Sequence, residues 1–201
     1  MEEKKGISKN VLFGIIGVSV LISIVVIVSF IIFYNSPKIV KNEKADAGYV
    51  SMTYTDDEAA FSILNASPIT YSVGMSLSGA DQYFDFTINT SILDDAIVEY
   101  EISLVKDSKS SNALDSNIKV YLEKQKSGTY VKEFGPKEFE GIKTNSDIGS
   151  PKGSMVIAKV SKQKDSTDNY RLRMWVSDKA VISDGSLQNY TVKVLVKGKA
   201  K

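Results

Sequence analysis

Carboxylate side chains are the main candidates for chemistry in this chain, because its 201 residues include no histidine and no cysteine. This composition excludes a Ser-His-Asp triad, a cysteine nucleophile, disulfide bonds and metal sites that need imidazole or thiolate ligands. Two carboxylates held at a suitable separation can cleave a glycosidic bond, and several together can bind a hard cation. Acidic residues gather at Asp56-Asp57-Glu58, at Asp94-Asp95, and at Asp165 with Asp168.

The run from Asp165 to Asn169 is the best candidate for a calcium site. It reads Asp-Ser-Thr-Asp-Asn, and the oxygen atoms of Asp165, Asp168 and Asn169 are ligands of the kind that calcium prefers. It lacks the glycine and the distal glutamate of an EF-hand loop. The alternative, which we favour, is that these side chains cap and solvate a turn. We assign no catalytic residue, no resident metal and no cofactor.

A second candidate site is a stripe of Arg171, Arg173 and Trp175. These are the only arginines and the only tryptophan of the chain, and alternate positions place them on one face of an expected strand. Such side chains bind proteins or envelope polymers by stacking and bidentate hydrogen bonding. The alternative, which we favour, is a structural stripe, in which a neighbouring loop covers Trp175 and the arginines pair with glutamates.

An apolar segment near the N-terminus predicts a membrane anchor. Residues 11–34 contain no charged side chain, and as a helix they would span about 36 Å, enough for a hydrocarbon core of about 30 Å. We therefore predict a cytoplasmic tail at 1–10, a transmembrane helix at 11–34 that contacts lipid, and a polar linker at 35–48. The domain at 49–201 is expected outside the plasma membrane.

An alternative to the uncleaved anchor is a signal peptide that is removed. The tripeptide Ala45-Asp46-Ala47 fits the small-x-small cleavage pattern, so cleavage after Ala47 would release the domain. The apolar segment is longer than the core of an ordinary signal peptide, which favours the anchor. Lysines are nearly balanced on the two flanks, so the orientation rests mainly on the size of the C-terminal domain.

The rest of the chain alternates between apolar and polar residues with period two, the pattern of half-buried antiparallel strands. Five segments show it clearly: 83–89, 98–104, 118–123, 170–177 and 190–197. Four weaker candidates are 49–55, 61–64, 129–134 and 154–161. Eight or nine short strands in this length predict an all-β fold, an antiparallel β-sandwich of jelly-roll or Ig-like topology. The longest weakly patterned stretches, 106–117 and 137–153, are expected to be exposed loops.

Several of these runs also resemble a group of surface proteins. The stretches AAFSILNASPIT, YFDFTINTSILDDAIVEYEISL, NIKVYLEK, NYRLRMWVSDKAV and NYTVKVLVK are similar to uncharacterised membrane-anchored proteins of low-GC Gram-positive bacteria. They fall between residues 58 and 197. The resemblance implies a membrane-anchored extracellular β-sandwich. In layout alone, the chain is more distantly similar to exported fibre proteins of the TasA/camelysin type, a likeness that transfers no function.

These observations favour a non-catalytic, single-pass surface protein that serves in adhesion, assembly or the cell envelope. The formal net charge of +1 argues against nucleic acid as a partner, because such binders rely on a strong basic field. The expected partner is a protein or a cell-envelope polymer, and a homo-oligomer is compatible with the sequence but unsupported by it. The alternatives are an accessory or sensor subunit of a membrane complex and, more remotely, an envelope enzyme that uses carboxylates.

Overall fold

The structure is a computed structural model that describes residues 38–45, 48–54, 59–93, 95–111, 113–144, 146–182 and 186–200. Side chains are described from residue 50 onward within these ranges, residue 54 excepted. They belong to one compact unit, Pro37–Lys201. The predicted tail, the predicted transmembrane helix and Ala47 lie outside the described residues. Within those residues, no helix has the length and apolar character needed to span a bilayer.

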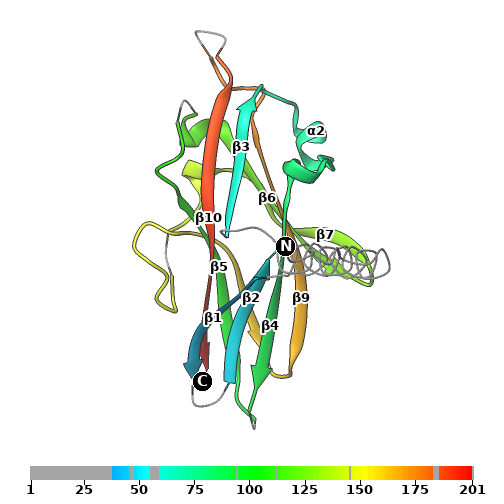
Figure 1. Ribbon diagram of the computed structural model, residues 1–201, viewed down its shortest axis with the longest axis vertical. Coiled ribbons are helices and arrows are strands. Elements are labelled where there is room, and N and C mark those ends of the chain that lie inside the picture. Colours follow the sequence, from blue (N-terminus) through cyan, green and yellow to red (C-terminus); the bar gives the residue numbers. More distant parts are fainter. Residues whose placement is uncertain are drawn as a thin grey trace, which may run out of the picture. The chain divides into compact units, whose positions relative to one another are not determined.

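The described unit is a sandwich of two antiparallel sheets (Figure 1). One sheet, here called sheet A, has the hydrogen-bonded order β1-β2-β4-β9-β6-β7, and sheet B has the order β3-β10-β5-β8. The strands are β1 (Lys38–Ala45), β2 (Gly48–Tyr54), β3 (Ala60–Ala66), β4 (Phe84–Ile92), β5 (Val98–Lys106), β6 (Ile118–Lys126), β7 (Thr129–Glu138), β8 (Met155–Lys162), β9 (Ser166–Val176) and β10 (Gln188–Ala200). This arrangement confirms the predicted all-β sandwich.

All nine predicted strands are present, and one more precedes them. Residues 38–45 were expected within a linker, but they form β1, which pairs with β2 at the edge of sheet A. The prediction was therefore wrong for this segment. A polar edge strand that is paired on one side only need not show an apolar face, so its pattern resembles that of a linker. The boundary of the β-domain lies near residue 38 rather than residue 49.

The core lies between the two sheets and follows the predicted alternation. In β4, Phe84, Phe86 and Ile88 point inward, and in β10, Val192, Val194 and Val196 do the same. Phe86 stacks on Tyr170 of β9, with ring centroids 5.4 Å apart. Because each sheet presents one apolar face, face-to-face packing removes both faces from water.

Short helical elements occupy the connections. They are α2 (Tyr71–Met75) and three 3₁₀ turns at Ala80–Gln82, Asp115–Asn117 and Phe139–Gly141. Residues 69–82, here called the covering segment, contain α2 and lie against the outer face of sheet A beside β9 (Figure 1). Backbone hydrogen bonds join this segment to the end of β9, from Ile69 N to the Val176 oxygen (3.0 Å) and from Asp178 N to the Ile69 oxygen (3.1 Å).

Candidate functional site

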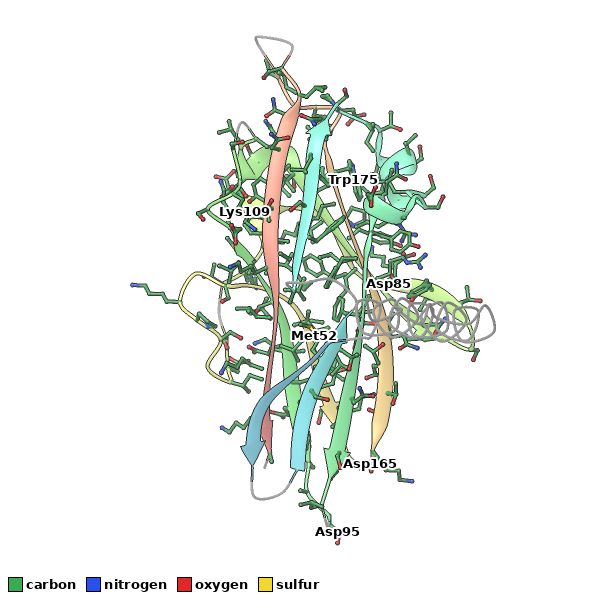
Figure 2. All side chains as sticks on the ribbon, viewed as in Figure 1. Met52, Asp85, Asp95, Lys109, Asp165 and Trp175 are labelled. Atoms are coloured by element: carbon green, nitrogen blue, oxygen red, sulfur yellow. The ribbon has the colours of Figure 1, made fainter. Side chains whose placement is uncertain are left out.

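Trp175 is buried under the covering segment. It is 2% exposed, it lies beside α2 (Figure 2), and the ring of Tyr71 meets it edge-on with centroids 6.2 Å apart. Gly74 approaches so closely that a Cβ there would lie 2.2 Å from two carbons of the indole. The prediction that Trp175 belongs to an exposed contact stripe is therefore wrong. The alternative interpretation, in which a neighbouring segment covers it, is confirmed.

Arg173 is also enclosed by the covering segment. Its side chain is 8% exposed, its Nε donates to the Leu77 carbonyl at 2.7 Å, and its guanidinium pairs with Glu123 of β6. The hydrogen bond to Leu77 ties the covering segment to the sheet, and the ion pair with Glu123 joins β9 to its neighbour β6. Because both charged groups are buried, they leave little surface for a partner. Burial lowers the pKa of Arg173 from its ordinary value, although the group stays charged.

Arg171 is the half-buried member of the stripe. It forms a bidentate pair with Asp85 of β4, from Nε to Oδ1 and from Nη2 to Oδ2, each 2.7 Å long. Its guanidinium carbon lies 3.8 Å from the ring centroid of Tyr83 and 4.4 Å from that of Tyr130. The hydrogen bond to Asp85 raises the pKa of Arg171. The expected pairing with glutamate is thus made with an aspartate here.

The three candidate calcium ligands do not converge. Asp165 accepts a hydrogen bond from Ile92 N at 2.7 Å at the start of β9, the end opposite Trp175 (Figure 2). Asp168 faces the inside of the sandwich, and Asn169, the next residue of the strand, faces outward. The described residues contain no group of three or more acidic side chains placed to hold a metal ion. The favoured alternative, that these side chains cap and solvate a turn, fits only Asp165, which precedes the strand; it is wrong for Asp168 and Asn169, which lie within β9.

Asp168 is the centre of a polar network that joins the two sheets. Its carboxylate accepts a hydrogen bond from Tyr100 of β5 at 2.6 Å, and Tyr100 also contacts the hydroxyl of Tyr170 at 2.7 Å. Lys124 and Lys162 pair with the same carboxylate at 2.9 and 2.7 Å. Burial opposes ionisation of Asp168, but hydrogen bonds from Lys162, Tyr100 and Lys124 outweigh it and lower its pKa. Burial is also the main reason why the pKa of Tyr100 is raised.

Glu101 anchors a loop on the outer face of sheet B. This carboxylate is 2% exposed, and it accepts hydrogen bonds from Ser146 Oγ (2.6 Å) and Asp147 N (3.0 Å). Lys159 bridges Glu101 and Asp147. Burial opposes the ionisation of Glu101, but these hydrogen bonds lower its pKa. Two hollows lie beside the loop, of about 180 and 420 Å³, and both include Asp147 and Lys159 in their walls.

The remaining acidic clusters offer no assembled site among the described residues. Residues 56–58 and residue 94 lie outside those residues, and Asp95 is exposed. Each buried carboxylate among the described residues already has a basic partner: Glu101, Asp107 and Asp168 pair with lysines, and Glu123 pairs with Arg173. Sequence reasoning missed the networks of Asp168 and Glu101. The signal for the first was a tyrosine at an inward position on each of two strands that the fold brings together, Tyr100 and Tyr170.

The outer face of sheet A carries a row of neutral polar side chains beyond the covering segment. Thr87 Oγ1 donates to Asn169 Oδ1 at 2.9 Å, and Asn169 Nδ2 donates to Gln125 Oε1 at 2.9 Å, which joins β4, β9 and β6. Thr53 lies opposite Thr87 at one end of the row, and Tyr130 lies opposite Gln125 at the other. Thr167 donates to Asn89 Oδ1 at 2.9 Å in the next row. We call these seven residues the open face.

Comparison with known proteins gives no relative for this arrangement: no protein-family model and no curated protein matches the chain. The sandwich, its two buried carboxylate networks and the open face are therefore interpreted from their own chemistry.

Proposed function

We propose that this chain is a non-catalytic, single-pass surface protein, whose β-sandwich is held outside the plasma membrane by the helix predicted at 11–34. Its role is that of an adhesion, assembly or cell-envelope module. The apolar run of 24 uncharged residues supports the anchor. The resemblance of residues 58–197 to membrane-anchored surface proteins supports the location.

The use of the buried carboxylates supports a binding role over an enzymatic one, and this observation carries the proposal. Asp168 accepts hydrogen bonds or ion pairs from three side chains, and Glu101 is held by a loop and a lysine. A general acid needs a carboxyl whose pKa is raised toward the working pH. The pKa of each of these carboxyls is lowered instead, which suits a permanent structural anion.

Cysteine labelling on intact cells tests the topology. The natural chain has no cysteine, so Ser78→Cys and Ser8→Cys each introduce a single thiol. Ser78 is exposed on the covering segment. A membrane-impermeant maleimide should label the full-length chain at position 78 and not at position 8, and permeabilised cells should label at both.

Labelling at position 8 alone would reverse the orientation and remove the proposed role at the cell surface. Recovery of a shortened chain from the medium, beginning after Ala47, would replace the anchor with a cleaved signal peptide. The accessory-subunit alternative predicts that the chain co-purifies with one membrane complex in detergent, whereas an adhesion module should be recovered alone.

A further inference from the structure

We propose that the open face binds a neutral glycan, and this inference rests on the proposed extracellular location. The face consists of Thr53, Thr87, Asn89, Gln125, Tyr130, Thr167 and Asn169, which β2, β4, β9, β6 and β7 present side by side. Four spacings of about 4.8 Å separate these five strands, so the face is roughly 19 Å wide. This width accommodates a short oligosaccharide lying across the strands.

The charge of the face selects a neutral ligand. None of its seven residues is charged, although 24% of the chain is charged. Beside the face, the guanidinium of Arg171 is neutralised by its bidentate pair with Asp85. The adjacent row of the same sheet carries charges, but most of them are paired: Glu123 pairs with Arg173, and Lys132 lies opposite Glu123. The seven residues themselves therefore offer an anionic polymer no charge to bind.

The hydrogen-bonding groups of the face suit the hydroxyls of a sugar. A sugar hydroxyl both donates and accepts, so it pairs with amides and with other hydroxyls. Asn169 accepts a hydrogen bond through its side-chain oxygen and donates one through its NH₂ group, and these two bonds fix the orientation of its amide. Gln125 and Asn89 each accept a hydrogen bond through the side-chain oxygen, and neither side-chain NH₂ group donates to a described residue. Two half-buried amides thus offer donors to a ligand.

Tyr130 supplies an aromatic border at the β7 end of the face. It is half-buried, and its ring is held against the guanidinium of Arg171. A ring fixed in this way loses little conformational freedom when a ligand packs beside it, and the apolar C–H face of a sugar ring packs well on an aromatic surface. The open face contains no exposed large aliphatic side chain, which argues against a protein partner at this site.

The test uses the full-length protein in lipid nanodiscs and an array of hexasaccharides. Neutral probes are built from glucose, galactose, mannose and N-acetylhexosamines, and polygalacturonate is the anionic probe. We expect at least one neutral hexasaccharide to bind and polygalacturonate not to bind. Gln125→Ala should weaken that binding about fivefold, the size of one lost hydrogen bond. Gln163→Ala is the matched control, because Gln163 is exposed in the turn between β8 and β9. This variant should bind the hexasaccharide with the same affinity as the natural chain.

Asn89→Ala is a second variant that keeps the test decisive if Gln125→Ala folds poorly, and it should also weaken binding about fivefold. The proposal is overturned if no neutral hexasaccharide binds, if polygalacturonate binds more tightly, or if the variants and Gln163→Ala bind equally. These failures leave the proposed surface location intact. Labelling at position 8 alone would instead contradict that location.

Discussion

The two halves of the outer face of β9 lie on one strand and in one sheet, yet their surroundings differ. Toward the end of the strand, Arg173 and Trp175 are buried beneath the covering segment. Toward its start, Thr167 is exposed and Asn169 half-buried. The alternation of side chains along β9 is the same in both halves. A period-two pattern therefore identifies which residues share a face, but it does not show whether another segment covers that face.

The difference also has an energetic side. The covered half removes an indole from water and encloses the ion pair between Arg173 and Glu123. Truncation of Trp175 would therefore lose apolar burial, and truncation of either charged residue would leave the other buried without its partner. The open half makes hydrogen bonds between neutral groups that water can replace, and such bonds contribute little to stability. We expect the covered half to serve the fold and the open half to serve binding.

Trp175→Ala should give the largest loss of stability. Truncation of a buried tryptophan removes its packing and leaves a cavity beneath α2, so the free energy of unfolding should fall by about 3–5 kcal/mol. Denaturant unfolding of the full-length protein in mild detergent, followed by circular dichroism, measures this. Thr167→Ala, on the same face of the open half, should change the free energy of unfolding by less than about 0.5 kcal/mol. Equal losses would contradict the distinction between the halves.

Gly74→Ala should be the next most damaging change, although it adds only one methyl group. The new Cβ would lie 2.2 Å from the indole of Trp175, so α2 must move away from the sheet. Overpacking of this kind costs about 1–3 kcal/mol. In the same unfolding assay, Gly128→Ala is not a suitable control, because Gly128 has a positive φ of 82°. Ser72→Ala on the exposed side of α2 is suitable, and it should be nearly neutral.

Positions set by the alternation along β9 could be predicted from the sequence, whereas positions set by contacts with distant segments could not. The inward positions of Leu172, Met174 and Val176 were predictable, because each is apolar and they recur with period two along the strand. The sequence raised the covering of Trp175 by a neighbouring loop as an alternative but could not identify the covering residues, since residues 69–82 are about a hundred positions away. The inward position of Asp168 was also missed, because the polar residues around it resemble a turn although they form the start of β9. Lysines from β6 and β8 neutralise the Asp168 carboxylate, which allows it to face inward.

Acidification should weaken the junction between the sheets at Asp168. Its pKa is lowered in the folded state, so its contribution to stability is complete above the usual aspartate pKa of about 3.9. That contribution is lost as the pH falls from this value through the lowered folded pKa. Asp168→Asn should therefore be less stable at pH 7 and should lose less stability between pH 5 and pH 2 than the natural chain. Parallel curves of unfolding free energy against pH would show that Asp168 does not carry this dependence.

Gln125→Ala should have the smallest effect on stability and so gives the sharpest test of the open half. Gln125 is half-buried, and its side chain accepts one hydrogen bond from Asn169, which water can replace in the variant. The free energy of unfolding should fall by less than about 1 kcal/mol. Because the same side chain offers a donor to the proposed glycan, affinity should fall while the fold is retained. A loss as large as that of Trp175→Ala would mean that the open face stabilises the sheet as strongly as the covered one, and it would remove the reason for assigning the two halves different roles.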